Sequence, residues 1–111
     1  MAHELDAYVI TADYLPDNIA HKYSDEYCNV SITELKATLK AAEEKKIDGV
    51  ISFACDPGVV TVAYVAEKLG LPSAGALKTV LILQNKAQFR AFLTENSFRI
   101  PITRGFTDEE Q

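Results

Sequence analysis

Glycine, cysteine and histidine are scarce in this sequence, and each scarcity excludes a kind of site. The five glycines form neither of the Gly-rich loops that hold phosphates or dinucleotides. The two cysteines, Cys28 and Cys55, lack a CxxC spacing, so we predict reduced thiols in the core. The only histidines, His3 and His21, form no metal motif and offer Cys55 no evident base. We therefore predict neither a metal site nor a cysteine nucleophile.

Long apolar runs and a basic N-terminal region are missing as well. No run approaches the roughly 18 apolar residues of a membrane span. Residues 1–6 resemble no signal peptide, so we predict a cytoplasmic protein without a membrane partner. At 111 residues the chain predicts one domain, which is small for a complete two-substrate enzyme.

Positive charge is rare overall but concentrated in one part of the chain. The net charge of −5 argues against nucleic acid as a partner. Residues 1–77 hold six Lys/Arg against twelve Asp/Glu, whereas residues 78–104 hold five Lys/Arg against one Glu. Residues 105–111 add three acidic side chains. The basic stretch 78–104 is therefore a candidate anion site.

Residues 48–72 carry the clearest structural pattern. Residues 50–53 are an apolar, β-branched run that predicts a strand covered on both faces. Asp56 and Pro57 then suit the N-cap and first residue of an apolar helix, and Gly70 with Pro72 suits its end. A strand feeding such a helix predicts an α/β fold, in which ligands collect at the carboxyl ends of the strands.

That rule makes the loop after residue 53 a candidate substrate site. Its residues are Cys55, Asp56, Pro57 and Gly58. Asp56 has an alternative role, in which it only caps the helix and binds no substrate. Asp13, after an earlier predicted strand, could bind a ribose, but the Gly-rich turn that should precede such an acid is absent.

The rest of the chain predicts further strands and helices around this unit. We expect a strand at residues 7–11 and a short strand within residues 23–30. Ser31 and Glu34 form a capping-box pattern that predicts a surface helix running to about Lys46. We also expect helices at residues 76–83 and from Asn85 to about 96, an extended segment at 98–102, and a helix start at 107–110.

Lys86 is the basic residue that is least easily explained as an ordinary solvent-exposed side chain. It lies in the first turn of the predicted helix, where the helix dipole disfavours a positive charge, and Arg90 follows one turn later on the same face. A phosphate would satisfy both cations and the free amides of that turn. A solvated lysine remains the alternative.

The motifs of residues 48–50, 63–72, 85–93 and 100–101 together resemble the front end of ATP-grasp enzymes. The string is similar to the preATP-grasp domain of the carbamoyl-phosphate synthase large chain, biotin carboxylase and related carboxylate–amine ligases. The likeness spans about residues 8–106. It implies a three-layer, Rossmann-like α/β domain over residues 1–84 with a short, mostly parallel sheet, and the start of the ATP-grasp domain over residues 85–111.

The resemblance also implies a function and a truncation at both ends. The parent ligase would use ATP and Mg²⁺ to activate a carboxylate as an acyl phosphate and pass it to an amine or similar nucleophile. Lys86, supported by Arg90, would contact the ATP phosphates, residues 55–58 would face the acceptor substrate, and this chain alone would not be catalytic. Its remaining partner would be the rest of the ATP-grasp domain.

The family's first strand is missing, which leaves a gap that the resemblance places between residues 7–11 and 50–53. Either the sheet closes up without that strand, or a second copy fills the gap by dimerising or swapping. The rival interpretation is a free-standing Rossmann- or flavodoxin-like module that binds a small anion or a protein. An unbuilt helix start within residues 105–111 favours the truncated ligase over this module.

Overall fold

The computed structural model describes residues 2–104 and 106, and it has a two-stranded parallel sheet in the N-terminal part of the chain. Strand β1 (Ile10–Asp13) pairs with β2 (Glu26–Asn29) in a register that places Ile10 opposite Glu26 and Asp13 opposite Asn29. The 3₁₀ turns η1 (His3–Leu5) and η2 (Ile19–Tyr23) precede and connect the strands. The predicted α/β class with a short parallel sheet is confirmed, while the three-layer arrangement stays a prediction.

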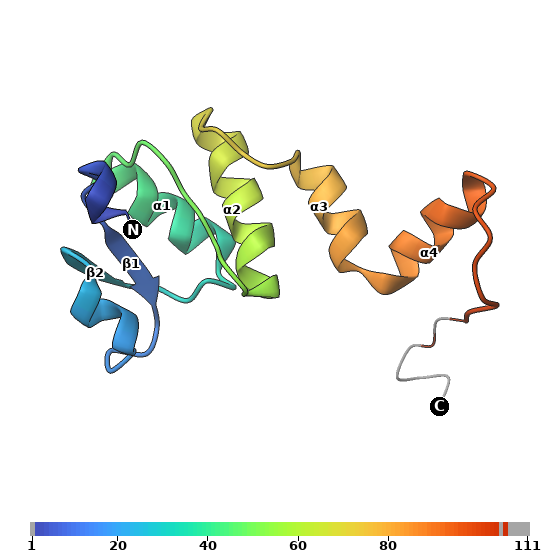
Figure 1. The fold of residues 1–111 in the computed structure, drawn as a ribbon, viewed down its shortest axis with the longest axis horizontal. Helices are drawn as coiled ribbons and strands as arrows, with labels where there is room; N and C mark the ends of the chain where they lie inside the picture. The colour runs from blue at the N-terminus through green and yellow to red at the C-terminus, as the bar shows by residue number, and fades with distance from the viewer. Residues whose placement is uncertain (1, 105, 107–111) are drawn as a thin grey trace.

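Helix α2 (Asp56–Leu69) is the central element of the fold (Figure 1). It begins one residue earlier than expected, with Cys55 as N-cap and Asp56 as an exposed first residue. Gly70 adopts φ 65° at its end, and the amides of Gly70 and Leu71 both donate to the carbonyl of Ala66. The Leu71 bond is that of a Schellman close and the Gly70 bond is that of the simpler left-handed cap, so the predicted C-terminus is confirmed.

The predicted capping box of the preceding helix is wrong. Helix α1 (Leu35–Lys45) has Glu34 as its N-cap, and no side chain caps it. The Ser31 hydroxyl instead bonds Thr33, and the Glu34 amide donates to the carbonyl of Ser31 in a tight turn. Because this turn uses the groups that a capping box needs, the helix starts after it. Its end, at Lys46 in the left-handed region, agrees with the expectation.

The strand predicted at residues 50–53 is also wrong. Residues 48–54 have no secondary structure, and among the described residues none of them makes a backbone–backbone hydrogen bond. Ile51 and Phe53 are 88% and 93% exposed. A strand forms only against a neighbour, and β1 pairs with β2 alone in the described part. This apolar segment therefore runs uncovered from α1 to α2.

The core is small and lies between helices. Its buried apolar side chains are Ala42 of α1, Ala63, Val65 and Ala66 of α2, and Val80 of the next helix. Thr61 is the buried polar residue, and its hydroxyl donates to the carbonyl of Ile32. That bond fastens α2 to the loop between β2 and α1.

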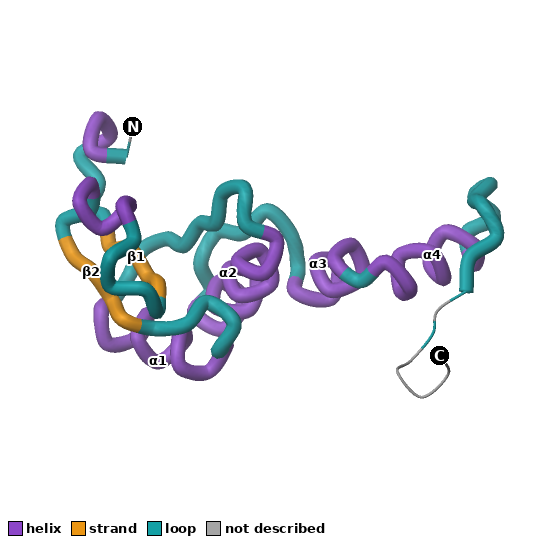
Figure 2. Tube along the Cα trace, turned by 90° about the horizontal axis from the view of Figure 1, so that it is seen from below, coloured by secondary structure: helices purple, strands orange, loops and turns teal. Residues whose placement is uncertain are grey.

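Helices α3 (Leu77–Gln84) and α4 (Lys86–Glu95) form an arm that leads away from the rest (Figures 1 and 2). Helix α3 packs on α2, and α4 packs on α3. Asn85 caps α4 as predicted, because its side chain accepts a hydrogen bond of 3.0 Å from the amide of Gln88. We call residues 77–104 the arm and residues 2–76 the body.

Two expectations for the C-terminal part have different outcomes. Residues 98–102 join no sheet, and Ile102 is 99% exposed. The helix start predicted at residues 107–110 lies outside the described residues. No described helix has both the length and the apolar character needed to cross a membrane.

Candidate functional site

The candidate site is a pocket at the carboxyl edge of the sheet. Its volume is about 580 Å³, and the residues lining it are Tyr14, Ser31, Ile32, Thr33, Glu34 and Pro57. Tyr14 directly follows β1, residues 31–34 follow β2, and Pro57 lies in the first turn of α2. In open α/β sheets ligands bind outside the carboxyl ends of the strands, and this pocket has that position.

Hydrogen bonds hold the loops around the pocket in place. The Thr61 hydroxyl anchors the carbonyl of Ile32, and the hydroxyls of Ser31 and Thr33 bond each other at 2.9 Å. On the β1 side, the Asp13 carboxylate accepts hydrogen bonds from the amide of Leu15 at 2.9 Å and the side chain of Asn18 at 2.5 Å. These bonds, the Leu15 amide first, lower the pKa of Asp13 below its ordinary 3.8. Asp13 therefore orders its own turn, which argues against the ribose-binding role.

The pocket's chemistry suits a small polar ligand. The side chains of Tyr14, Ser31 and Thr33 bring hydroxyl groups, and Glu34 brings a carboxylate. Hydroxyls can donate to or accept from a polar ligand, whereas the carboxylate favours a cationic group such as an ammonium. Among its lining residues there is no cation.

The predicted loop of residues 55–58 lies beside this pocket and contributes one wall. Pro57 lines the pocket, Asp56 is exposed, and Cys55 is partly buried as the N-cap of α2. Gly58 is buried against Ser52, and a Cβ at this position would collide with the Ser52 side chain. The absence of a side chain at Gly58 thus lets residue 52 pass close to the first turn of α2.

Lys86 and Arg90 lie on the arm, away from the pocket lining. Lys86 is the exposed first residue of α4 and Arg90 is partly buried one turn later. Neither makes an ion pair with another described residue. Because the Asn85 side chain already occupies the amide of Gln88, an anion here would meet mainly the two side-chain cations. The starts of α2 and α4 lie toward the same lower side of Figure 1.

Sequence reasoning missed most of the pocket lining. Residues 31–34 were interpreted as a helix cap, and Tyr14 was not considered as a ligand-binding residue. The available signal was position, because Tyr14 lies three residues after the strand predicted at residues 7–11 and residues 31–34 directly follow the segment 23–30 predicted to contain a strand. Residues 55–58 were selected because ligands bind at the carboxyl ends of strands, and the same reason would have selected Tyr14 and residues 31–34.

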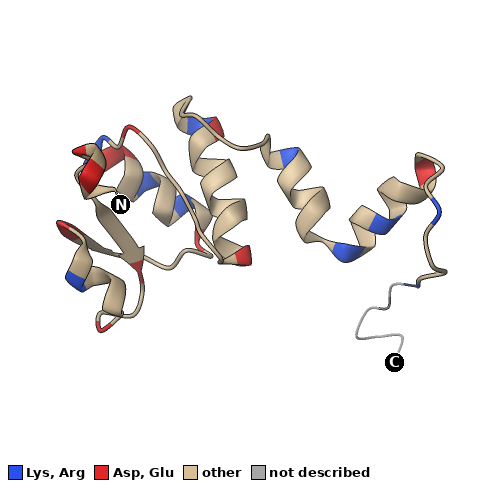
Figure 3. Cartoon of the chain, in the orientation of Figure 1, with Lys and Arg blue, Asp and Glu red and all other residues tan. Residues whose placement is uncertain are grey.

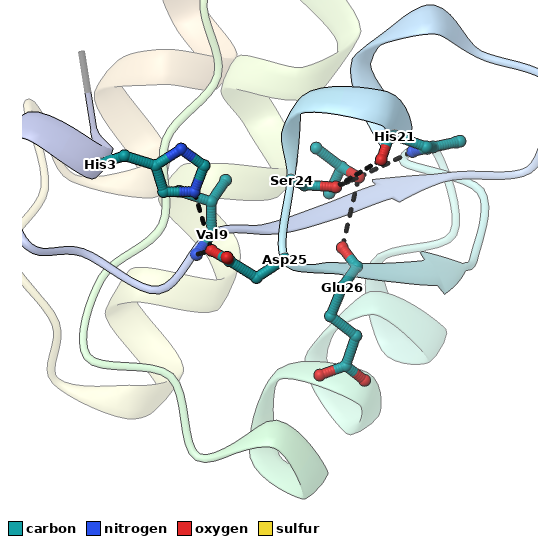
Figure 4. A network of polar contacts seen from close by, with 7 residues as sticks. His3, Val9, His21, Ser24, Asp25 and Glu26 are labelled. Atoms are coloured by element: carbon teal, nitrogen blue, oxygen red, sulfur yellow. Dashed lines mark hydrogen bonds and ion pairs between the residues drawn. The ribbon is translucent and has the colours of Figure 1, made fainter.

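A separate polar network ties the N-terminal segment to the sheet (Figure 4). Asp25 accepts hydrogen bonds from the amide of Val9 at 2.7 Å and from His3 at 2.9 Å. The Thr11 hydroxyl bonds His21 at 2.7 Å and Ser24 at 2.8 Å. Since both histidines are bonded within the fold, we assign the network a structural role. The described residues contain no group of three His, Cys, Asp or Glu side chains that could hold a metal.

This network predicts an acid-sensitive contact at Asp25. The Val9 amide, and then His3, lower the pKa of Asp25 from its ordinary 3.8. A carboxyl whose folded pKa is depressed stabilises the fold above its unfolded pKa, and this contribution is lost as the pH falls through the folded value. We therefore expect the Val9 amide NMR signal to titrate with a midpoint below 3.8. In Asp25→Asn that titration should disappear, and in the control Asp48→Asn, which leaves the bonds of Asp25 in place, it should persist. An unchanged titration in Asp25→Asn would contradict the assignment.

Comparison with known proteins gives one match. A family model, the ATP-grasp N-terminal domain, matches residues 5–73, which is more than half of the chain. The matched region holds the sheet, α1, α2 and every residue that lines the pocket. No curated protein and no solved structure matches.

Proposed function

Because the chain belongs to the ATP-grasp N-terminal domain family, we propose that it is the substrate-side domain of an ATP-grasp ligase. The ligase would activate a carboxylate as an acyl phosphate with ATP and transfer it to an amine or similar nucleophile. We place it in the group of the carbamoyl-phosphate synthase large chain and biotin carboxylase, on the order of its motifs between residues 48 and 101. The observation that carries the proposal is the family match, because it covers the whole pocket.

In this proposal the pocket receives the acceptor substrate. Glu34 would attract the ammonium group of an amine, and the hydroxyls of Ser31 and Thr33 would orient it. Residues 55–58 would close one side through Pro57. The chain itself would position the substrate and contribute no catalytic residue.

The division of the chain follows from the same proposal. Residues 1–84 would form the preATP-grasp domain, and residues 85–111 would begin the ATP-grasp domain, whose catalytic remainder is the partner. Asn85 is a natural boundary, because it ends α3 and caps α4. The family match stops at residue 73, before α3 begins.

Among the described residues, Lys86 and Arg90 suit the phosphates of MgATP, but no group of side chains suits its Mg²⁺ ion. Lys86, the first residue of α4, and Arg90, four residues later, have the spacing at which two side chains on one helix face can together hold phosphate oxygens. ATP, when bound, would supply the phosphoryl group that activates the carboxylate. The described part offers no metal-binding cluster, so we assign the Mg²⁺ ligands to the catalytic domain.

The test is ATP affinity in the protein that carries this chain together with its catalytic domain. Removing the Lys86 ammonium in Lys86→Ala should raise the Kd for ATP about 10- to 100-fold, the loss expected for a hydrogen-bonded charge. Affinity for adenosine, which has no phosphate, should not change. Lys78→Ala removes a matched, exposed lysine from α3 and should leave the Kd for ATP unaltered. Unchanged ATP affinity in Lys86→Ala would remove Lys86 from the site.

A further inference from the structure

The chain exposes much more surface than a compact protein of its mass. Its accessible surface is 8914 Å², whereas a compact monomer of 12.2 kDa exposes about 6,100 Å². The seven residues outside the described part could account for at most about 1,100 Å² of the excess, even in an unfolded chain. At least about 1,700 Å² therefore lacks cover, which is the area that one subunit buries in a large homodimer interface.

The arm makes the molecule extended, and part of the uncovered area lies on it. The radius of gyration is 17.1 Å and the molecule extends over 48 × 30 × 24 Å, whereas a compact chain of this length has a radius of about 13 Å. Helix α4 packs on α3 rather than on the body (Figure 2). Large apolar side chains are exposed on both parts. They include Leu81, Leu83, Phe92, Phe98 and Ile102 on the arm, Ile51 and Phe53 between α1 and α2, and Leu5, Tyr8, Tyr14, Leu15, Ile19 and Tyr23 elsewhere on the body.

The charges of the two parts are complementary. The arm carries five Lys/Arg and one Glu, whereas the body carries six Lys/Arg and twelve Asp/Glu. Figure 3 shows the basic residues along the arm and most acidic residues on the body. Among described residues the ion pairs lie within the body, so the arm's cations have no partner there. Because α3 already packs on α2 and α4 leads outward, the arm cannot reach residues 51–53 of its own body without repacking.

We propose that the arm docks on the body of a second copy of this chain. The basic residues of the arm face the acidic body, and its exposed apolar side chains cover Ile51 and Phe53. The contact is reciprocal, because each copy offers one arm and one body, so two copies form a closed dimer with two equal interfaces. Charge of opposite sign steers the association, and burial of the apolar side chains holds it. The inference does not depend on ATP or on the proposed ligase.

The test is the mass of the purified chain by light scattering over a range of concentrations. We expect twice 12.2 kDa at high concentration, with a dimer Kd that rises as salt increases from about 0.05 to about 0.5 M. Reversing two arm charges in Lys78→Glu/Arg99→Glu should raise the dimer Kd at least about tenfold. Lys36→Glu makes one such charge reversal on α1, where it adds acidity to the body, and should not weaken the dimer. Phe53→Ser should weaken it at every salt concentration.

Zero-length cross-linking between isotopically light and heavy copies identifies the contact. Mixed links between arm lysines such as Lys78 and carboxylates of the body support the proposal. Mixed links confined to body–body pairs, as expected from strand pairing of two sheets, overturn it. A mass of 12.2 kDa at all concentrations up to about 1 mM, where even a weak dimer would be detected, also overturns it. Circular dichroism establishes that each variant, altered at an exposed position, keeps its helices.

Discussion

Val65→Asp is expected to unfold the body of the chain. Val65 has no exposed surface and lies near the middle of α2, where it belongs to a core with few other buried apolar side chains. An aspartate there would bury a charge without a partner, at a cost above about 4 kcal/mol. Small domains are stable by only about 5–15 kcal/mol, so we expect loss of the helical circular dichroism signal or a large fall in the urea midpoint.

Leu5→Asp is the matched control for that substitution. Leu5 is 80% exposed in η1, so the same aspartate remains hydrated and should change stability by less than about 0.5 kcal/mol. The comparison separates burial from the chemistry of the new side chain. Equal urea midpoints for the two variants would mean that Val65 does not lie in the core of the folded chain.

The helices could be predicted from the sequence because their ends are decided locally. Gly70 and Asn85 each act within one turn of their own helix, so a few neighbouring residues suffice to identify the end. The capping box at residues 31–34 failed for a related reason. Ser31 had two local options, and its turn with Thr33 and Glu34 replaced the cap.

Strands depend on partners that a local pattern does not contain. Residues 26–29 form a strand because β1 lies beside them, whereas residues 50–53, with a stronger β-pattern, have no neighbour. The pocket lining was missed for the same reason. Tyr14, Ser31 and Pro57 are distant in sequence. The parallel pairing of β1 with β2 brings Tyr14 and Ser31 to one edge, and the bond from Thr61 to Ile32 holds α2, with Pro57, beside them.

The proposed roles divide between the body and the arm. The body holds the pocket and the family match, while the arm holds the basic residues proposed for ATP and for dimer contact. Lys86 would serve the nucleotide, whereas Lys78 and Arg99 would serve the second copy. The ATP titration and the dimer assay therefore use different residues, and each can fail without the other.

Thr61→Val is expected to destabilise the fold by removing the hydrogen bond that holds one wall of the pocket. The Thr61 hydroxyl is buried and donates to the carbonyl of Ile32, one of the residues that line the pocket. Valine keeps the shape of threonine but cannot donate, so the Ile32 carbonyl would lose this partner in the buried surroundings of residue 61. We expect a loss of about 1–3 kcal/mol in the free energy of unfolding, measured by urea denaturation.

Thr61→Ser is the control that distinguishes the hydrogen bond from packing. Serine keeps the hydroxyl and removes one methyl group, which should cost only about 1 kcal/mol. Amide exchange of residues 33 and 34, which border the pocket, should accelerate in Thr61→Val and change little in Thr61→Ser. If the serine variant instead proves the less stable of the two, the methyl contacts of Thr61 and not its bond to Ile32 hold this loop against α2.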